Sequence, residues 1–314
     1  MRGIVYKSTG TWYTVKTDDG TFYNCRIKGK FRIQGIKSTN PVAVGDRVIF
    51  EIEEIGGETV GVISEIEDRI NYIIRKSVKL SKQTHIIAAN IDQVFLIVTL
   101  KEPKTYTVFI DRFLATAEAY DIPTVLLFNK MDIYKEDELE QIDELVSLYR
   151  NIGYTCYSIS AITGSNVDDV KATMVGKTNM FAGHSGVGKS TLINLISPRI
   201  DIKTTKISEQ HLQGKHTTTF AEMYDLEFGA RIIDTPGIKG FGVVDMDPDE
   251  IGDYFPEIFR YKADCKFNNC LHLDEPDCAI KQALENQLIS KSRYSSYVQM
   301  VTGKEDTYRM DSYQ

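Results

Sequence analysis

The sequence lacks any long apolar run. Residues 94–100 form the best candidate and have only the length of a strand, whereas a membrane-spanning helix needs about 20 apolar residues. Residues 1–10 contain no apolar core of the kind that a secretory signal requires. We therefore expect a cytoplasmic protein without a membrane partner. With 314 residues, the chain is long enough for two or three domains, each with its own core.

Cysteine is also scarce, and the five cysteines are an odd number that suits no disulfide framework. Cys156 falls in an apolar, strand-like run and is expected to be a core residue. Three of the others gather near the C-terminus in the pattern Cys265-x4-Cys270-x-His272-x5-Cys278. Three thiolates and one imidazole are the ligand set of a closed, tetrahedral structural zinc site, so we expect one zinc ion there and no catalysis. A reduced cluster without metal is the alternative.

The sequence also lacks an excess of basic residues, since its net charge is −7. The charge is unevenly distributed: residues 1–50 hold nine Lys or Arg and three Asp, and an acidic excess begins at Glu51. Basic residues alternate with Phe31 and Ile33 within a twelve-residue stretch and are candidates for RNA binding: Arg26, Lys28, Lys30, Arg32 and Lys37. A solvated strand face is the alternative. Nearby aromatic residues are expected in the core instead of stacking on bases: Trp12, Tyr13, Phe22 and Tyr23.

The first ~70 residues read as short β-strands separated by turn signals such as Asp18-Asp19-Gly20. About five strands in this length predict a small barrel of the OB type, and a barrel with a purely structural role is the alternative. From Asp92 onward, apolar runs alternate with helical stretches at 106–120 and 136–149. This alternation predicts a mostly parallel α/β sheet covered by helices. After residue 242 the chain turns Asp/Pro-rich, then Cys-rich, then helical from about Ala279, which indicates a third, small domain.

A phosphate-binding loop of the form G-x-x-x-x-G-K-S lies between an apolar strand and a helical stretch. Its residues are Gly183, His184, Ser185, Gly186, Val187, Gly188, Lys189, Ser190 and, one further on, Thr191. The glycines allow backbone N–H groups to surround phosphate at a helix N-terminus. Lys189 would bridge phosphate oxygens, and the Ser190 hydroxyl would bind Mg²⁺.

A guanine-reading motif, Asn129-Lys130-Met131-Asp132, follows another apolar strand. A buried Asp132 carboxylate would accept from the N1–H and the 2-amino group of guanine, which adenine does not offer, so the motif predicts GTP in preference to ATP. Asn129 would orient the loop, and the Lys130 stem would pack on the base. Ser160-Ala161 ends a later strand and fits a second guanine contact through the Ala161 N–H.

Switch signals follow the phosphate loop. Asp234-Thr235-Pro236-Gly237 would hold Mg²⁺ through Asp234 and sense the γ-phosphate through Gly237. In the segment 214–219, a threonine would bind Mg²⁺, with Thr218 or Thr219 preferred. The position after the switch glycine is Ile238, which cannot orient water, so His216 is the candidate catalytic residue. Contact with RNA or solvent is the other interpretation of His216.

The motif order is unusual, because the guanine motif and Ser160-Ala161 precede the phosphate loop and the switches. With the barrel in front and the Cys/His cluster behind, the whole chain resembles the ribosome small-subunit-dependent GTPases of the RsgA family. The resemblance implies a circularly permuted GTPase that binds 16S rRNA on the small subunit, acts late in its maturation, and leaves after subunit-stimulated GTP hydrolysis. It also places the family's catalytic histidine at His216.

The expected division is therefore an RNA-binding barrel at 1–70, a permuted GTPase domain at 71–244 and a zinc-binding domain with a helical tail at 245–314. We expect a monomer. Two other functions remain open from sequence: an RNA-binding module in which GTP only stabilises the fold, and a GTP-dependent regulator of mature ribosomes under stress.

Overall fold

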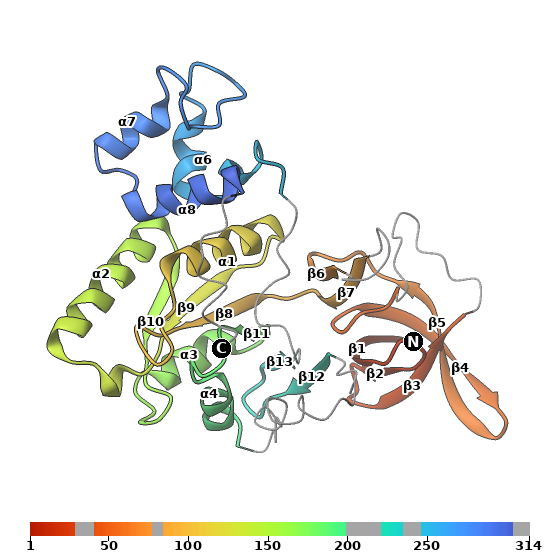
Figure 1. The fold of residues 1–314 in the computed structure, drawn as a ribbon. Helices are drawn as coiled ribbons and strands as arrows, with labels where there is room; N and C mark the ends of the chain where they lie inside the picture. Colours follow the sequence, from red (N-terminus) through yellow and green to blue (C-terminus); the bar gives the residue numbers. More distant parts are fainter. Residues whose placement is uncertain (29–40, 77–83, 199–220, 235–245, 304–314) are drawn as a thin grey trace, which may run out of the picture.

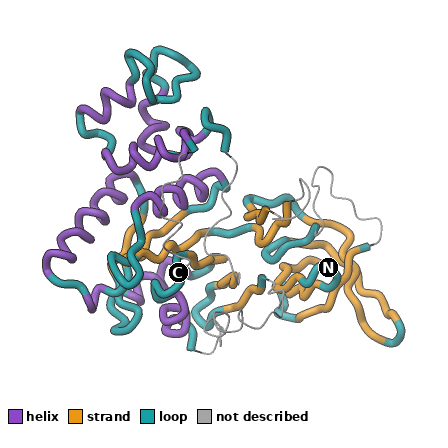
Figure 2. Tube along the Cα trace, viewed as in Figure 1, coloured by secondary structure: helices purple, strands orange, loops and turns teal. Residues whose placement is uncertain are grey.

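The computed structural model describes residues 1–28, 41–76, 84–198, 221–234 and 246–303. A strand-rich part lies at the N-terminal end, a sheet flanked by helices lies in the middle, and a helical part follows (Figures 1 and 2). No helix among the described residues is both long and apolar enough to cross a membrane.

Five strands form a closed barrel at the N-terminus: β1 (Arg2–Ser8), β2 (Tyr13–Thr17), β3 (Phe22–Ile27), β4 (Arg47–Ile55) and β5 (Glu58–Ile66). They follow the order β1-β2-β3-β5-β4, and β4 pairs back with β1 to close the ring. Inward-facing residues alternate along the strands and fill the barrel with Val5, Tyr13, Val15, Cys25, Val48, Phe50 and Ile63. The expected OB-type barrel is confirmed. A hairpin that the sequence did not predict follows it, formed by β6 (Tyr72–Lys76) and β7 (Thr84–Ala89).

The central sheet has the order β10-β9-β8-β11-β13-β12. Its strands are β8 (Gln93–Val98), β9 (Thr124–Phe128), β10 (Thr155–Ser158), β11 (Thr178–Ala182), β12 (Glu222–Asp225) and β13 (Arg231–Asp234). All neighbouring pairs are parallel except β12–β13. Every residue of β8, β9 and β11 except Gln93, Thr124, Thr178 and Asn179 is apolar, and all are buried. Strands of this kind need cover on both faces, and the helices provide it.

Helices α1 (Thr107–Ala119) and α2 (Glu136–Ile152) pack on one face of the sheet through Ile110, Leu114, Ile142 and Val146. Helices α3 (Val167–Met174) and α4 (Lys189–Ile196) pack on the other through Val170, Met174, Leu192 and Ile196. The predicted α/β sheet is therefore confirmed, and the carboxyl ends of β8, β9, β10 and β11 share one edge (Figure 1).

The barrel and the central sheet meet where β1 pairs with β12 at Lys7 and Glu222. The Lys7 ammonium lies 3.1 Å from the Glu222 carboxylate, and the Tyr6 hydroxyl donates to Asp225 at 2.7 Å. Strand β12 thus connects the barrel to β13, which ends at Asp234.

The C-terminal helices are η3 (Ile251–Tyr254), α6 (Pro256–Lys262), α7 (Ala279–Glu285) and α8 (Lys291–Thr302). They surround a small core that includes Phe255, Ile258, Ile280 and Tyr297. Ala115 of α1 belongs to the same core, so this region packs on the α1 side of the central sheet (Figure 1).

Candidate functional site

The phosphate loop connects the end of β11 at Ala182 to the first residue of α4, Lys189. Gly183, Gly186 and Gly188 all have positive φ, at 139°, 84° and 101°, which L side chains rarely adopt. Two of them also have no room for a side chain: a Cβ on Gly183 would lie 2.7 Å from the Ile97 carbonyl oxygen, and one on Gly188 would meet the Asn129 amide. The glycines of the motif are therefore required by the local backbone.

The Lys189 ammonium turns back into the loop that precedes it. It donates to the carbonyl oxygens of Gly183 and His184 at 2.5 and 2.6 Å. Burial lowers the pKa of Lys189 to about 8. The half-buried Ser190 and the exposed Thr191 stand in the first turn of α4, where unpaired helix N–H groups favour an anion.

Asn129 joins three motifs that lie far apart in the sequence. Its side-chain N–H donates to the Val187 carbonyl oxygen of the phosphate loop at 2.8 Å, and its side-chain oxygen accepts from the Ala161 N–H at 2.9 Å. The Asn129 side chain is 1 % exposed. One buried amide therefore holds the guanine motif, the phosphate loop and the Ser160-Ala161 pair together.

Asp132 lies at the start of the short helix η1 (Met131–Ile133), beside Ser160. The Ser160 hydroxyl donates to an Asp132 carboxylate oxygen at 2.5 Å. The Asp132 residue is exposed. Lys130 adopts the left-handed conformation, with φ of 70°, and its ammonium contacts the Glu102 carbonyl oxygen. Met131 is half-buried.

The loop at 99–106, to which sequence reasoning gave no role, supports both motifs. The Tyr134 hydroxyl donates to the Asn129 carbonyl oxygen at 3.0 Å and accepts from the Leu100 N–H at 2.9 Å. Pro103 lies 3.3 Å from where a Gly186 Cβ would be. The only sequence signal was the position of this loop, since it directly follows a buried strand at the same edge of the sheet as the motifs.

His184 also has a neighbour that the motif does not reveal. Its ring lies 3.9 Å from the Phe109 ring of α1, centroid to centroid, at an interplanar angle of 35°. The phosphate loop is thus in contact with a helix on the opposite side from α4.

The switch residues are only partly placed. Asp234 ends β13 next to the phosphate-loop strand, with Ile233 opposite Met180. The other predicted switch and catalytic residues lie outside the described residues: His216, Thr218, Thr219 and Gly237.

The Cys/His cluster is assembled as predicted. The ligand atoms of Cys265, Cys270, His272 and Cys278 all lie within 4.8 Å of one another. His272 Nδ1 is 3.5 Å from the sulfurs of Cys265 and Cys278, which are 4.0 Å apart. Tetrahedral zinc, with bonds of about 2.3 Å to sulfur and about 2.0 Å to nitrogen, would place sulfurs ~3.8 Å apart and a nitrogen ~3.5 Å from each sulfur. The donor set therefore fits zinc.

His272 is oriented by its surroundings. It has a left-handed φ of 59°, and the Glu275 carboxylate accepts from the backbone N–H groups on either side of it, Leu271 at 2.6 Å and Leu273 at 2.8 Å. Burial lowers the pKa of His272, which favours the neutral imidazole that a metal binds. Burial and the neighbouring thiols raise the pKa of Cys270 to about 12, so a cation is needed to hold the Cys270 thiol as a thiolate.

On the barrel, Arg26 and Lys28 are exposed along and just after β3, and Arg26 lies 3.6 Å from Glu53. Lys30, Arg32 and Lys37 lie outside the described residues. Two aromatic expectations are wrong: Trp12 and Phe22 are 46 % and 53 % exposed. Trp12 directly precedes β2 and Phe22 begins β3. At these strand ends, the alternation of inward- and outward-facing side chains that buries Tyr13 no longer applies.

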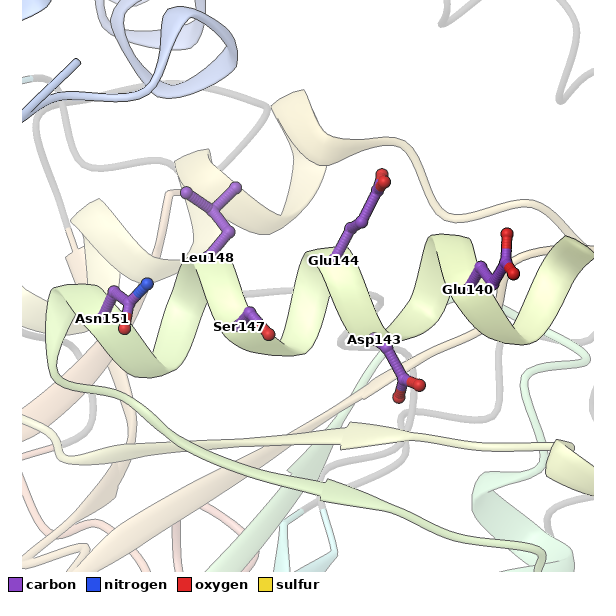
Figure 3. A pocket seen from close by; sticks show the side chains of 6 residues that line it. All are labelled: Glu140, Asp143, Glu144, Ser147, Leu148 and Asn151. Carbon is purple, nitrogen blue, oxygen red and sulfur yellow. The ribbon is translucent and has the colours of Figure 1, made fainter.

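Figure 3 shows a surface hollow along α2 that is lined by one helix alone. Its lining residues are Glu140, Asp143, Glu144, Ser147, Leu148 and Asn151. An acidic helix face without a second wall offers no binding site, and none of the motifs contributes to it.

The fold and the assembled loops define a class: nucleotide-binding proteins of the phosphate-loop type, here with the guanine-motif strand preceding the phosphate-loop strand in the chain. Comparison with models of protein families narrows this class to one family. The RsgA GTPase model matches residues 66–244, and the model of the RsgA N-terminal domain matches residues 2–63. The chain belongs to the RsgA GTPase family.

Relatives and solved structures agree. A small ribosomal subunit biogenesis GTPase RsgA from Christiangramia forsetii is 68 % identical over 314 residues, 100 % of both chains. One from Flavobacterium johnsoniae is 61 % identical over 313 residues, covering 100 % of this chain and 96 % of the relative. The crystal structure of YjeQ from Thermotoga maritima superposes with a TM-score of 0.77 at 37 % identity, covering 96 % of this chain and 97 % of that one. YloQ, described as a circularly permuted GTPase, gives 0.74 at 32 % identity, with 96 % and 94 % covered.

Proposed function

We propose that this protein hydrolyses GTP as a nucleotide switch in the maturation of the small ribosomal subunit, binding that subunit through its 16S rRNA and leaving after hydrolysis. The observation that carries the nucleotide assignment is the buried Asn129 amide, which joins the guanine motif, the Ser160-Ala161 pair and the phosphate loop into one site. The relatives named as small ribosomal subunit biogenesis GTPases support the choice of the subunit as partner.

In this site, Asp132, Lys130 and the Ala161 N–H would hold the guanine base. The backbone of the loop from Gly183 to Gly188, the Lys189 ammonium and the first turn of α4 would hold the phosphates. Binding requires the Lys189 ammonium to exchange the Gly183 and His184 carbonyl oxygens for phosphate oxygens, which are better partners for a cation.

Mg²⁺ would be held by Ser190, by Asp234 and by Thr218 or Thr219, and would neutralise charge that develops on the phosphates. His216 would orient the attacking water, since Ile238 has no polar group for this task. Gly237 would report the loss of the γ-phosphate to the chain that leads to the C-terminal region.

Zinc is the metal proposed for the Cys/His cluster, in a structural role, because four protein ligands complete its coordination. The basic residues 26–37 of the barrel are proposed to bind rRNA phosphates. We further propose a cytoplasmic monomer divided at residues 70 and 244 into a barrel, a GTPase domain and a zinc domain.

The central experiment measures GTP turnover by the full-length protein with and without purified small subunits. The proposal expects turnover that rises strongly on adding subunits, and loss of the stimulated rate in His216→Ala. A rate that small subunits leave unchanged would contradict the ribosomal role. Unchanged stimulated turnover in His216→Ala would remove only the catalytic assignment of that residue.

A further inference from the structure

A buried network of charges joins the C-terminal helices to the central sheet. Arg293 of α8 is 0 % exposed and donates through Nη1 to Asp111 of α1 at 2.8 Å. Its Nε and Nη2 donate to the two carboxylate oxygens of Glu257 in α6, at 2.6 and 3.1 Å. One guanidinium therefore connects α8, α6 and α1.

Asp111 is held from several sides. Tyr149 of α2 donates to its carboxylate at 2.8 Å, and Ser296, one turn beyond Arg293, donates at 2.6 Å. Burial raises the pKa of Asp111, and the guanidinium and hydroxyl donors oppose that rise. A buried carboxylate with this many donors cannot shift without leaving polar groups unpaired, so the position of α1 is tied to that of α8.

The same helix touches the phosphate loop on its other side. Phe109 precedes Asp111 by two residues, which is about 200° around a helix with ~3.6 residues per turn. The Phe109 ring contacts the His184 ring of the phosphate loop, while Asp111 and Ala115 face the C-terminal helices. Helix α1 is thus packed between the phosphate loop and α8.

Helix α8 makes hydrogen bonds both to α1 and to the segment around His272. While Arg293 and Ser296 bind Asp111, the Tyr294 hydroxyl donates to the His272 carbonyl oxygen at 2.6 Å and the Tyr297 hydroxyl donates to the Leu271 carbonyl oxygen at 2.9 Å. Both carbonyls belong to the segment that carries the histidine of the metal cluster. A short path of contacts therefore runs from the cluster through α8 and α1 to the phosphate loop, and it does not use the covalent link 235–245.

We propose that α8 and α1 couple the C-terminal metal centre to the phosphate loop, with Arg293 and Phe109 as positioning residues for nucleotide binding. The coupling rests on the proposed nucleotide site. Neither residue touches the nucleotide. Arg293 fixes α1, and Phe109 on α1 fixes the His184 end of the loop before the phosphates arrive. Because linkage is reciprocal, bound nucleotide also tightens the metal centre.

The test measures the affinity of the full-length, zinc-loaded protein for a fluorescent GDP analogue. The triple variant Arg293→Met/Asp111→Asn/Glu257→Gln removes the charges without leaving one unpaired in the interior. We expect its affinity to fall about fivefold, at the lower end of allosteric couplings. Phe109→Ala should cause a similar fall, and the two changes combined should cost little more than either alone, because they interrupt one path. Ser296→Ala removes one hydrogen bond to Asp111 and keeps all three charged side chains, so it weakens the contact between α8 and α1 in a protein that still folds.

Lys266→Met is the matched control, since Lys266 pairs with Asp277 on the surface of the same region and should leave GDP affinity unchanged. The second measurement is the rate at which zinc passes to a chromophoric chelator. GDP should slow it in the wild type and not in the triple variant. Wild-type GDP affinity in the triple and Phe109 variants, or fully additive losses, would overturn the coupling. Wild-type affinity in Lys189→Ala would instead overturn the proposed phosphate site.

Discussion

Asn129 and Val187 are 58 residues apart in the chain, and the side-chain amide of the first donates to the carbonyl oxygen of the second at 2.8 Å. The same amide accepts from the Ala161 N–H on its other side. One side chain therefore joins the loop that begins at Asn129, the Ser160-Ala161 pair and the loop at 183–188.

Asn129→Ala should separate these loops. It leaves the Val187 carbonyl and the Ala161 N–H without partners in the interior, at a cost of about 1–3 kcal/mol for each unsatisfied group. We expect the free energy of unfolding to fall by about 2 kcal/mol and GDP affinity to fall at least about tenfold. Urea unfolding and calorimetric titration measure the two effects. Asn151→Ala, on the exposed end of α2, is the matched control, and equal behaviour of both variants would contradict the role of Asn129.

Asp132→Asn should change which base is preferred. An amide in place of the carboxylate cannot accept from both guanine donors, but its N–H can donate to the 2-oxo group of xanthine. Affinity for GTP should fall about a hundredfold or more, and affinity for XTP should rise. Competition binding with both nucleotides measures the exchange. Asp143→Asn, on the outer face of α2 (Figure 3), should leave both affinities as they are. Loss of GTP binding without any gain for XTP would show that Asp132 does not read the base.

Lys189 makes nucleotide binding depend on pH, because burial lowers its pKa to about 8. Phosphate would restore a pKa near the ordinary ~10.4, so binding takes up a proton above about pH 8 and weakens as pH rises further. The effect on folding without nucleotide has the opposite sign. Because burial disfavours the charged form of Lys189, the free energy of unfolding increases as pH rises from about 8 to ~10.4. Calorimetry of GDP binding in two buffers of different ionisation heat measures the uptake. It should vanish in Lys189→Met, and its absence in the wild type would contradict this account.

The sequence predicted the elements that carry motifs better than the contacts between them. The helix expected at 106–120 is α1, Thr107–Ala119, and the loop at 183–188 lies between strand and helix as expected, because these motifs impose their own backbone. The exposure of Trp12 and Asp132 depends on where a strand or turn ends in space, which periodicity does not show. The pair Arg293–Asp111 spans 182 residues and has no local pattern at all. A charged residue in an amphipathic helix looks the same in sequence whether it meets water or a buried partner.

Removing the metal should loosen the C-terminal core. Because Cys278 belongs to that core and His272, the other buried residue of the cluster, is 4 % exposed, a metal bound by them would contribute to the folding of the core. We expect about one zinc per chain by elemental analysis. Cys278→Ser or a strong chelator should release it and make the region after residue 246 sensitive to protease. Cys156→Ala, at a buried cysteine of β10, should keep both the zinc and the resistance. A C-terminal region that stays resistant after metal loss would show that the cluster is not structural.

Two exposed side chains of the barrel, Lys28 and Trp12, allow the contributions of charge and of stacking to RNA binding to be separated. Lys28 is exposed just after β3, and a contact between its ammonium and an rRNA phosphate would release counterions. Lys28→Gln should therefore weaken binding to 16S rRNA and lower the slope of log affinity against log salt by about 1. Trp12, 46 % exposed, has no charge, so Trp12→Ala should cost about 1–3 kcal/mol of binding if a base stacks on it, and should leave that slope unchanged.

Filter binding to an rRNA fragment over a series of salt concentrations measures both quantities. Lys171→Gln, in α3 on the central sheet, is the matched control for the loss of one positive charge. If Lys28→Gln and Lys171→Gln lower the slope equally, the barrel attracts RNA only through overall charge and Lys28 makes no phosphate contact. If Trp12→Ala binds like the wild type, the exposed indole serves another purpose and the barrel contacts the RNA backbone alone.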